Sequence, residues 1–404
     1  MKYKNIFFFV VIFLFISCSS EHHKYQYIST LTLQSKYSSL FPIGLGTHHT
    51  DIQDSTNFIP SNFSSITSAS GLKFDHIHPH IDEYDFSRAD SLYAFAQRNK
   101  LIFRGHTLVW GNRNPYWLFW DPKGNMVNRK LLDDRLKDHI MTVVGRYKKG
   151  VYAWDVVNEA VYDNDKEWLK NNTWYKIMGA DYIYNAFRYA HEADSSALLF
   201  YNDYNAEFPD KRKRIVKLID TIKERNIPIH GIGIQGHWTT NNLNLDDLED
   251  AIDAYSSLGL TVQITELNIV DSKTPGSDNP ASLKRLANSY HKLFKVLQKH
   301  RNQISGVTFW QSELPTHKYF PLFDSFFSTY NRLSLYYQCP IAQSLFSILS
   351  NPSEGEGLRP CWLKPLTHTT KKNSNFIISI SFHGKTNWLM ILKLQGGLFL
   401  MYRL

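Results

Sequence analysis

Short apolar runs alternate with amphipathic stretches along most of the chain, from about residue 40 to residue 350. Eight of these runs have the length and composition of buried strands, and helical patterns with charges on one side separate most of them. This alternation predicts an α/β fold with a parallel sheet, a single (β/α)8 TIM barrel. The predicted strands cover residues 41–47, 65–74, 101–110, 151–159, 198–204, 231–238, 261–269 and 306–310, and the clearest helical patterns cover residues 87–100, 129–149, 210–226 and 281–300.

Polar and aromatic residues gather at the carboxyl ends of these predicted strands, where a barrel of this kind carries its chemistry. Six strands share this feature, which makes loop or cap roles an insufficient explanation. Amides, imidazoles, aromatic rings and two carboxylates with little positive charge are typical of a site for a neutral, hydroxyl-rich ligand. The residues are His106 and Trp110 on the third strand, Asn158 and Glu159 on the fourth, Asn202, Asp203, Tyr204 and Asn205 on the fifth, Gln235 and His237 on the sixth, Glu266 and Asn268 on the seventh, and Trp310 on the eighth.

The two carboxylates at strand ends suggest a specific reaction. Glu159 ends the fourth strand and Glu266 the seventh, so they are expected to face each other across the barrel mouth. Two carboxyl groups that flank a glycosidic oxygen suffice for glycoside hydrolysis, one as acid and then base, the other as nucleophile. Like charge helps to keep one protonated while the other is ionised. A metal site with His106 and His237 as further ligands is the alternative, although no ligand pair has a familiar metal spacing.

Ten segments between about residue 37 and residue 324 give the sequence a family resemblance. The segments are FPIG, SIT…LKF, ADSLYAFA, RGHTLVWGNRNPYWL, WDVVNEA, FYNDYN, GIGIQGHW, ITELNI, GVTFW and PLFD. In this order and spacing they resemble glycoside hydrolase family 10, the xylanase family. The combination is specific, whereas Asn-Glu alone is shared by several other families of sugar hydrolases.

The resemblance implies a role for each matching residue of a retaining endo-1,4-β-xylanase that acts on xylan or xylo-oligosaccharides without a cofactor or metal. Glu159 would be the acid/base, Glu266 the nucleophile, and Asn158 would hold the sugar 2-hydroxyl. The other implied substrate contacts are Lys73, His106 and Trp110 in the glycone subsite, Tyr204, Gln235 and His237 around the nucleophile and the aglycone side, and Trp310 beneath the sugar that forms the covalent intermediate.

Several positions depart from the family pattern. Ala69 and Ser70 occupy the positions of a Glu-Asn pair before Lys73, so two hydrogen-bonding side chains for the outer glycone sugar are missing. Gly111 replaces the His expected after the strand-three Trp, and Arg113 replaces an amide. Recognition at these subsites is therefore expected to differ. A xylan-binding lipoprotein that has lost turnover and a β-1,4-glucanase are the two alternative functions.

A further departure lies beside the nucleophile. Asn268 replaces the acid expected two residues after Glu266. Its carbonyl oxygen can still accept a proton from His237, but it offers no charge. The orientation of the imidazole is therefore expected to survive while proton affinities change.

The C-terminal part of the chain matches the family least. After GVTFW the sequence lacks the expected second Trp, and beyond Asp324 the expected element that opens the last helix is replaced by STYNRLSLYYQCP. Residues 37–350 are assigned to the barrel, and residues 351–404 to an irregular tail of unknown structure. Two hypotheses remain open for the tail: it is a degraded or out-of-frame end, or it is a divergent extra segment.

The composition fits a large core and argues against nucleic-acid binding. The 404 residues are 43% hydrophobic and 15% aromatic, which is ample for one large domain. The formal net charge is +8, but residues 351–404 hold +5 of it and the first four residues hold +2. The body of the protein is nearly neutral and has no basic stripe with a nucleic-acid motif.

The N-terminus resembles an export signal. A cationic start precedes an apolar run at residues 6–16, which is too short for a comfortable membrane span. Cys18 follows a small residue directly after this run, as in the lipobox of bacterial lipoproteins. We therefore expect an export signal over residues 1–18, a linker over 19–36, and a monomer that touches a membrane only through Cys18, at the cell surface or in the periplasm. An ordinary signal peptide and secretion are the alternative. The other cysteines, Cys339 and Cys361, leave a disulfide open.

Overall fold

The computed structural model describes residues 32–52, 58–163, 167–275 and 279–310, together with the backbone of three strands between residues 375 and 403. The chain divides into two compact units, Met1–Phe326 and Phe327–Leu404. The expected export signal and Cys18, the cysteines Cys339 and Cys361, the PLFD segment and the barrel boundary at residue 350 lie outside the described residues.

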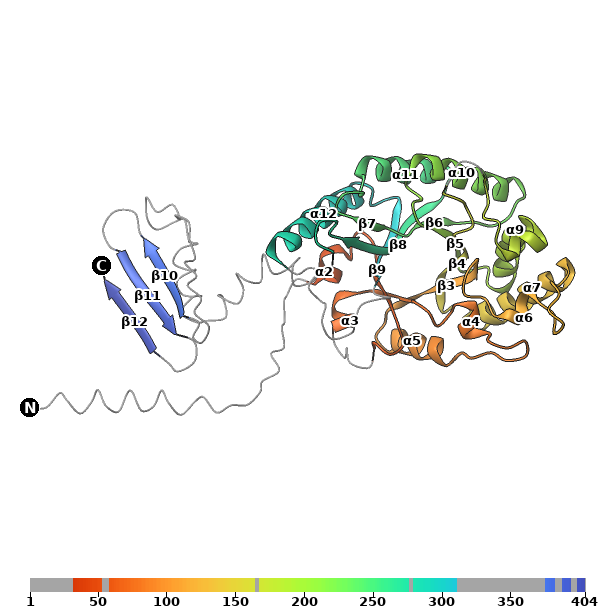
Figure 1. Ribbon diagram of the computed structural model, residues 1–404, viewed down its shortest axis with the longest axis horizontal. Coiled ribbons are helices and arrows are strands. Elements are labelled where there is room, and N and C mark those ends of the chain that lie inside the picture. Colours follow the sequence, from red (N-terminus) through yellow and green to blue (C-terminus); the bar gives the residue numbers. More distant parts are fainter. Residues whose placement is uncertain are drawn as a thin grey trace, which may run out of the picture. The chain divides into compact units, whose positions relative to one another are not determined.

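Eight parallel strands close into a barrel within the described part of the first unit, as the sequence predicts (Figure 1). Neighbouring strands pair in the order β6-β5-β4-β3-β2-β1-β9-β8, and pairing between β6 and β8 closes the ring. A short ninth strand, β7, pairs in parallel with β8. The strands are β1 (Ile43–Thr47), β2 (Ser65–Ser68), β3 (Ile102–Trp110), β4 (Val151–Asn158), β5 (Leu198–Asp203), β6 (Gly231–Ile234), β7 (His237–Thr239), β8 (Thr261–Val270) and β9 (Ile304–Trp310).

The second strand is shorter than the predicted range of 65–74. It ends at Ser68, whose Oγ accepts a hydrogen bond from the backbone N–H of Gly71 at 3.0 Å. Such side-chain bonds to the backbone favour a turn over continued pairing. Helix α4 (Phe74–Ile77) follows directly, so Lys73 lies at the start of a helix and not in a strand.

The predicted sixth strand, 231–238, is interrupted. Gly236 adopts a φ of +81°, in the left-handed region that ends extended pairing and suits glycine. A Cβ atom there would come within 2.9 Å of the Ile264 side chain. The chain therefore leaves β6 at Ile234 and begins β7 at His237, which places Gln235 and His237 on either side of the bend.

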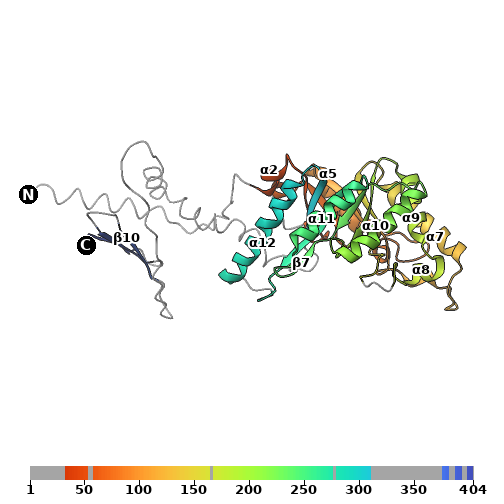
Figure 2. The ribbon, with the colours of Figure 1, turned by 90° about the horizontal axis from the view of Figure 1, so that it is seen from above.

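The helices surround the strands (Figure 1), and α12, α11, α10 and α9 follow one another along one side of the barrel (Figure 2). Asparagine side chains cap the first turns of α7, α8, α11 and α12, which explains where these helices begin. The other bounds are α2 (Leu33–Tyr37), α3 (Phe58–Asn62), α5 (Ser87–Arg98), α6 (Tyr116–Phe119), α7 (Arg129–Arg146), α8 (Thr173–Met178), α9 (Asp181–Ala193), α10 (Pro209–Glu224), α11 (Leu245–Ser257) and α12 (Pro280–Lys299).

A continuous apolar core lies between the strands and these helices. Its largest fully buried side chains include Trp154, Trp174 and Tyr182. Each such ring removes a large apolar area from water, which stabilises the fold by roughly 2–3 kcal/mol. This rigid frame holds the carboxyl ends of the strands in place. No helix in the described residues is long and apolar enough to cross a membrane.

The second unit contains a three-stranded antiparallel sheet (Figure 1) in the region that shows no clear sequence period. Its strands are β10 (Asn375–Ser381), β11 (Asn387–Lys393) and β12 (Leu398–Arg403), and β11 is the central strand. Each strand contains aromatic or β-branched residues, which favour extended pairing.

Candidate active site

The two carboxylates predicted from the sequence both lie at carboxyl ends of barrel strands. Glu159 directly follows β4, and Glu266 lies in the second half of β8. Glu159 has a φ of +58°, so the chain turns sharply out of the strand at this residue. Its side chain is 15% exposed, whereas that of Glu266 is 8% exposed. The rim therefore presents one partly accessible and one nearly buried carboxylate.

Three side-chain donors hold the carboxylate of Glu159. The Trp110 indole Nε1 donates to Oε2 at 3.0 Å. The amides of Asn158 and Gln235 donate to Oε1 at 3.1 and 3.0 Å. The Lys170 ammonium lies 3.9 Å from Oε2 and adds a favourable charge. Trp110, Asn158 and Gln235 are among the substrate-binding residues predicted from the sequence, whereas Lys170 is not.

The carboxylate of Glu266 lies in a more enclosed polar pocket. The Asn202 amide donates to Oε1 at 2.9 Å, and His237 Nε2 lies 3.3 Å from Oε2. His106 Nδ1 lies 3.9 Å from Oε1. Burial alone would raise the pKa of Glu266, but the two imidazoles outweigh burial and hold this pKa below its ordinary value. Glu266 is thus an anion across the neutral range.

One amide joins the surroundings of the two carboxylates. Asn202 Nδ2 donates both to Glu266 Oε1 and to Asn158 Oδ1, the latter at 2.8 Å. Its own Oδ1 accepts from the Thr265 hydroxyl at 2.6 Å, which fixes the orientation of the amide. Because Asn158 also donates to Glu159, a continuous chain of hydrogen bonds runs from one carboxylate to the other. The sequence offered Asn202 as a polar strand end but gave it no role.

A fully buried ion pair supports His106 from below. Arg104 donates to both carboxylate oxygens of Asp155, with Nη2 at 2.6 Å from Oδ1, and neither side chain is exposed. Asp155 Oδ2 lies 2.9 Å from His106 Nδ1. Burial alone would raise the pKa of Asp155, but Arg104 and His106 outweigh it and lower this pKa. A buried ionised aspartate therefore orients the imidazole that faces Glu266. Neither Arg104 nor Asp155 was predicted as a site residue.

The other residues that the sequence suggested as sugar contacts also lie on this rim. The Lys73 ammonium lies 5.1 Å from the Trp110 ring centroid. Burial lowers the pKa of Lys73, although Glu266 opposes this effect. Trp310 and His106 make an edge-to-face contact with centroids 5.3 Å apart. Gly46 leaves room for the Trp310 indole, since a Cβ atom there would lie 2.1 Å from Trp310 Cε3.

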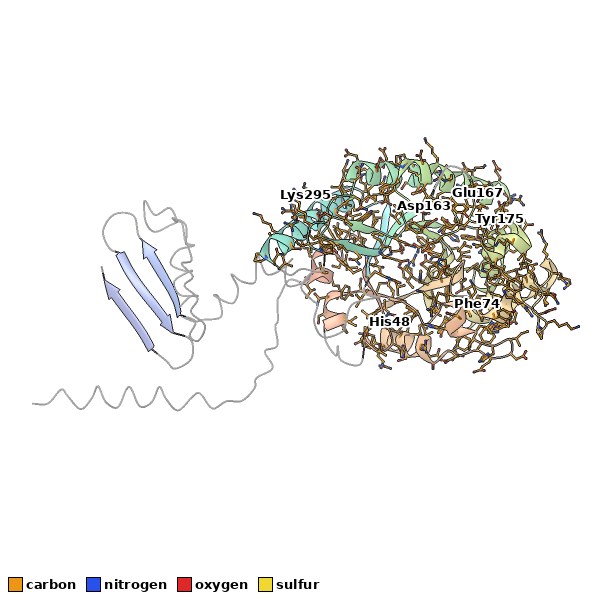
Figure 3. The ribbon with its side chains drawn as sticks, in the orientation of Figure 1. His48, Phe74, Asp163, Glu167, Tyr175 and Lys295 are labelled. Atoms are coloured by element: carbon orange, nitrogen blue, oxygen red, sulfur yellow. The ribbon has the colours of Figure 1, made fainter. Side chains whose placement is uncertain are left out.

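Tyr204 lies on the side of the site near Glu159. Its hydroxyl donates to Asp163 Oδ2 at 2.6 Å and accepts from Lys170 Nζ at 3.1 Å. Asp163 is labelled in Figure 3. Of the ten site residues predicted from the sequence, His106 and Glu266 lie within β3 and β8, and the other eight lie at strand ends or in the segments that follow them.

Residues at and near the positions that depart from the family pattern are joined by hydrogen bonds and an ion pair. Arg113 Nε lies 2.8 Å from Asp75 Oδ2, and Arg113 Nη2 donates to His76 Nε2 at 2.5 Å. Ser70 Oγ lies 2.9 Å from His48 Nδ1, and Ala69 is buried. A small hollow lies beside this network. It is lined by Lys73, Phe74, Thr107, Leu108, Trp110, Asn112 and Arg113.

The expected contact between His237 and Asn268 takes a different form. The two residues are register partners on β7 and β8, but the imidazole Nε2 is directed to Glu266. Among the hydrogen bonds of the described residues, none joins the side chains of His237 and Asn268. Because the anionic Glu266 is a stronger hydrogen-bond acceptor than the neutral amide of Asn268, the imidazole binds Glu266. In the part of the chain that the structure describes, no three His, Cys, Asp or Glu side chains form a metal-binding group.

The chain has many known relatives. The family model described as glycosyl hydrolase family 10 matches residues 32–315. An endo-1,4-β-xylanase B of Paenibacillus barcinonensis is 40% identical over 285 residues, which are 69% of this chain and 86% of the relative. An endo-1,4-β-xylanase of Geobacillus stearothermophilus is 41% identical over 287 residues, with the same two shares.

Solved structures agree with these relatives. A crystal structure of a Paenibacillus barcinonensis xylanase with a conduramine derivative has a TM-score of 0.66 and 38% identity, and covers 69% of this chain and 86% of its own. An endo-1,4-β-xylanase structure from Caldicellulosiruptor owensensis has a TM-score of 0.65 and 40% identity, and covers 69% of this chain and 87% of its own.

Proposed function

Because this chain belongs to glycosyl hydrolase family 10, we propose that it is a retaining endo-1,4-β-xylanase that hydrolyses internal linkages of xylan. The observation that carries the proposal is the hydrogen-bond chain through Asn158 and Asn202, which joins Glu159 at one strand end to Glu266 at another. We infer the substrate from the names of the relatives and the reaction from the two carboxylates of the site.

In the first step Glu266 acts as the nucleophile. Its lowered pKa keeps it ionised, and His237 and Asn202 hold its two oxygens in place. The carboxylate attacks C1 of the sugar in the glycone subsite while the bond to the leaving oxygen breaks. Glu159 gives its proton to that oxygen, so the departing chain leaves as a neutral alcohol.

In the second step Glu159 acts as a base. It removes a proton from a water molecule, and the oxygen of that water attacks C1 and displaces Glu266. Two displacements at one carbon retain its configuration. The Asn158 amide, which is held by Asn202, is placed to bind the sugar 2-hydroxyl, an interaction that strengthens as positive charge develops at C1.

The test compares the purified full-length chain with Glu159→Ala and Glu266→Ala on xylan and on carboxymethyl cellulose. We expect xylo-oligosaccharides from the wild type and nearly complete loss of turnover in both variants. Added azide should partly restore Glu159→Ala on substrates with good leaving groups, because azide replaces water without needing a base.

Other outcomes would select the two alternative functions. Binding of xylan without release of oligosaccharides would favour a non-catalytic binding protein, which the departures at Ala69, Ser70 and Gly111 suggest. Products from carboxymethyl cellulose alone would favour a β-1,4-glucanase.

We further propose that the protein is exported and anchored by a lipid at Cys18, because an apolar run and a small residue precede this cysteine. Expression with labelled palmitate should label the wild type and not Cys18→Ser, which should move from the membrane fraction to the soluble fraction. A soluble wild type would indicate an ordinary signal peptide. We also propose that the chain is a monomer, which light scattering would check.

For the C-terminus we propose that residues 351–404 are a degraded or out-of-frame end, with a divergent extra segment as the alternative. Intact-mass measurement of the native protein should then find a product that lacks part of the tail. If the tail is present, the protein should also fold after residues 351–404 are removed. A product that ends at Leu404 and needs its tail to fold would establish a functional extra segment.

A further inference from the structure

A buried lysine lies behind the proposed acid/base. The Lys211 side chain on α10 is only 2% exposed, and its ammonium donates to Asp203 Oδ1 at 2.8 Å and to Asp163 Oδ1 at 2.9 Å. An ammonium buried without partners is costly, and two carboxylates offset that cost here. Lys211 therefore ties the end of β5 to the segment that follows Glu159.

One branch of this network reaches the backbone of the acid/base. Asp203 Oδ2 accepts from the Tyr201 hydroxyl at 2.5 Å. The Tyr201 oxygen in turn accepts from the backbone N–H groups of Ala160 and Val161, both at 3.0 Å. These are the two peptide groups directly after Glu159. The hydroxyl of one buried tyrosine thus fixes the direction in which the chain leaves the acid/base.

The backbone conformation of Glu159 explains why these hydrogen bonds matter. Glu159 has a φ of +58°, a left-handed conformation that a residue with a side chain adopts at a cost of roughly 1–3 kcal/mol. Such a conformation persists only where the surroundings hold it. The Glu159 N–H donates to the Asn202 carbonyl at 2.9 Å, and Tyr201 binds the next two N–H groups. Three successive peptide groups are therefore fixed around the turn.

The second branch returns to the carboxylate itself. Asp163 Oδ2 accepts from the Tyr204 hydroxyl, and this hydroxyl accepts from Lys170, whose ammonium lies 3.9 Å from Glu159 Oε2. The Lys211 ammonium also lies 3.6 Å from the Tyr204 ring centroid. A continuous series of contacts therefore runs from the backbone after Glu159, through Lys211, to the Glu159 carboxylate.

We propose that Lys211 is a positioning residue for the acid/base: it holds the backbone after Glu159 through Asp203 and Tyr201, and the Lys170 ammonium through Asp163 and Tyr204. The proposal rests on the function proposed above for Glu159. The hydrogen bonds of the Lys211 ammonium go to Asp203 and Asp163, and each of these carboxylates leads on to Glu159. Lys211 should therefore affect the proton-transfer role of Glu159 and leave the nucleophile intact.

Leaving-group dependence tests this role. In full-length Lys211→Met, kcat/KM on xylan should fall roughly 10- to 100-fold, a part of the 10²- to 10⁴-fold that general acid catalysis contributes. On 2,4-dinitrophenyl β-xylobioside, whose leaving group needs no proton, kcat/KM should fall less than about threefold. Lys211→Arg should recover part of the loss on xylan because it restores the charge.

Lys213→Met is the matched control. Lys213 lies two residues further along α10, is 78% exposed, and forms an ion pair with Asp210 at 3.7 Å. It should behave as the wild type on both substrates. Equal losses on both substrates in Lys211→Met, or no loss on either, would overturn the proposal.

Tyr201→Phe covers the case in which Lys211→Met does not fold. This variant keeps the buried ring and removes only the hydroxyl that binds Ala160 and Val161. It should show the same selective loss on xylan, and an equal effect on both substrates would contradict the proposal. A wild type without activity on xylan would instead contradict the proposed function, so the two failures are distinguishable.

Discussion

The two proposed catalytic carboxylates have different surroundings, although Asn158 and Asn202 connect them. Glu266 lies against His237 and His106, and its pKa is lowered. Glu159 is nearer to solvent and is held by neutral donors, with Lys170 at the longer distance of 3.9 Å. The difference matches the roles: a nucleophile must stay ionised, whereas an acid/base must exchange a proton twice in each cycle.

The layers behind the two carboxylates differ in the same way. Behind Glu266, the buried Arg104–Asp155 pair orients the His106 imidazole, whose charge lowers the pKa of Glu266. Behind Glu159, Lys211 and Tyr201 hold peptide groups and act through backbone geometry. The residues around Glu266 therefore keep its carboxylate ionised, whereas the residues behind Glu159 fix the position of its backbone.

Amide substitutions of the two acids should give the largest contrast. On 2,4-dinitrophenyl β-xylobioside, Glu266→Gln should lower kcat/KM on the order of 10⁵-fold or more, because the nucleophile is lost. Glu159→Gln should lower it by less than about tenfold, because this leaving group needs no proton. Steady-state kinetics provides the measurement, and similar losses in both variants would remove the distinction between the two carboxylates.

Removal of Asp155 should have the next largest effect, on stability. Asp155→Ala leaves Arg104 buried without its partner and should lower the free energy of unfolding by about 3–5 kcal/mol. Asp134→Ala is the matched control, because the Lys130–Asp134 pair is 84% and 60% exposed and should contribute little to stability. Urea denaturation followed by circular dichroism measures both, and equal small changes would contradict a charged layer behind Glu266.

Asn202 belongs to both halves and should affect catalysis more than stability. Asn202→Ala removes the donor shared by Asn158 and Glu266, so kcat on xylan should fall roughly 100-fold, the scale observed when one preorganised donor is removed. Asn185→Ala removes an amide that binds Asp133, away from the strand ends, and should retain wild-type kinetics. A near-normal Asn202→Ala would mean that the two carboxylates work without this link.

The smallest expected effect is a shift in the pH profile. His237 helps to lower the pKa of Glu266, so His237→Ala should raise this pKa and leave more of the nucleophile protonated at acidic pH. The acid limb of kcat/KM should move to higher pH by about 0.5–1 unit. The exposed His291 on α12 provides the control, and an acid limb that stays in place would show that His237 does not tune Glu266.

Much of the barrel and its rim could be predicted from the sequence, because a strand buried on both faces leaves a continuous apolar run. Polar residues at the ends of such runs, such as Glu159, Gln235 and Glu266, are conspicuous for the same reason. The two misjudged strands involved local backbone chemistry: Ser68 forms a turn with Gly71, and Gly236 takes a positive φ. These features interrupt a strand without interrupting its apolar pattern.

The layer behind the rim could not be predicted from the sequence pattern. Arg104 and Asp155 lie within apparent core strands, and only the register of β3 with β4 brings their side chains together. Lys211 lies in the stretch DKRKR, which predicts a solvated helix face, yet it is buried while Lys213 is exposed. Which charge of such a run is buried depends on how α10 lies against the loops after β4 and β5.

The central claim is that Glu266 forms a covalent bond to the sugar while Glu159 moves the protons. Incubation with 2,4-dinitrophenyl 2-deoxy-2-fluoro-β-xylobioside should trap this intermediate, because the fluorine slows its hydrolysis by destabilising positive charge at C1. Peptide mapping by mass spectrometry should then locate one added disaccharide on the peptide that contains Glu266. An adduct on Glu159, or turnover of the active enzyme without any adduct, would contradict the account.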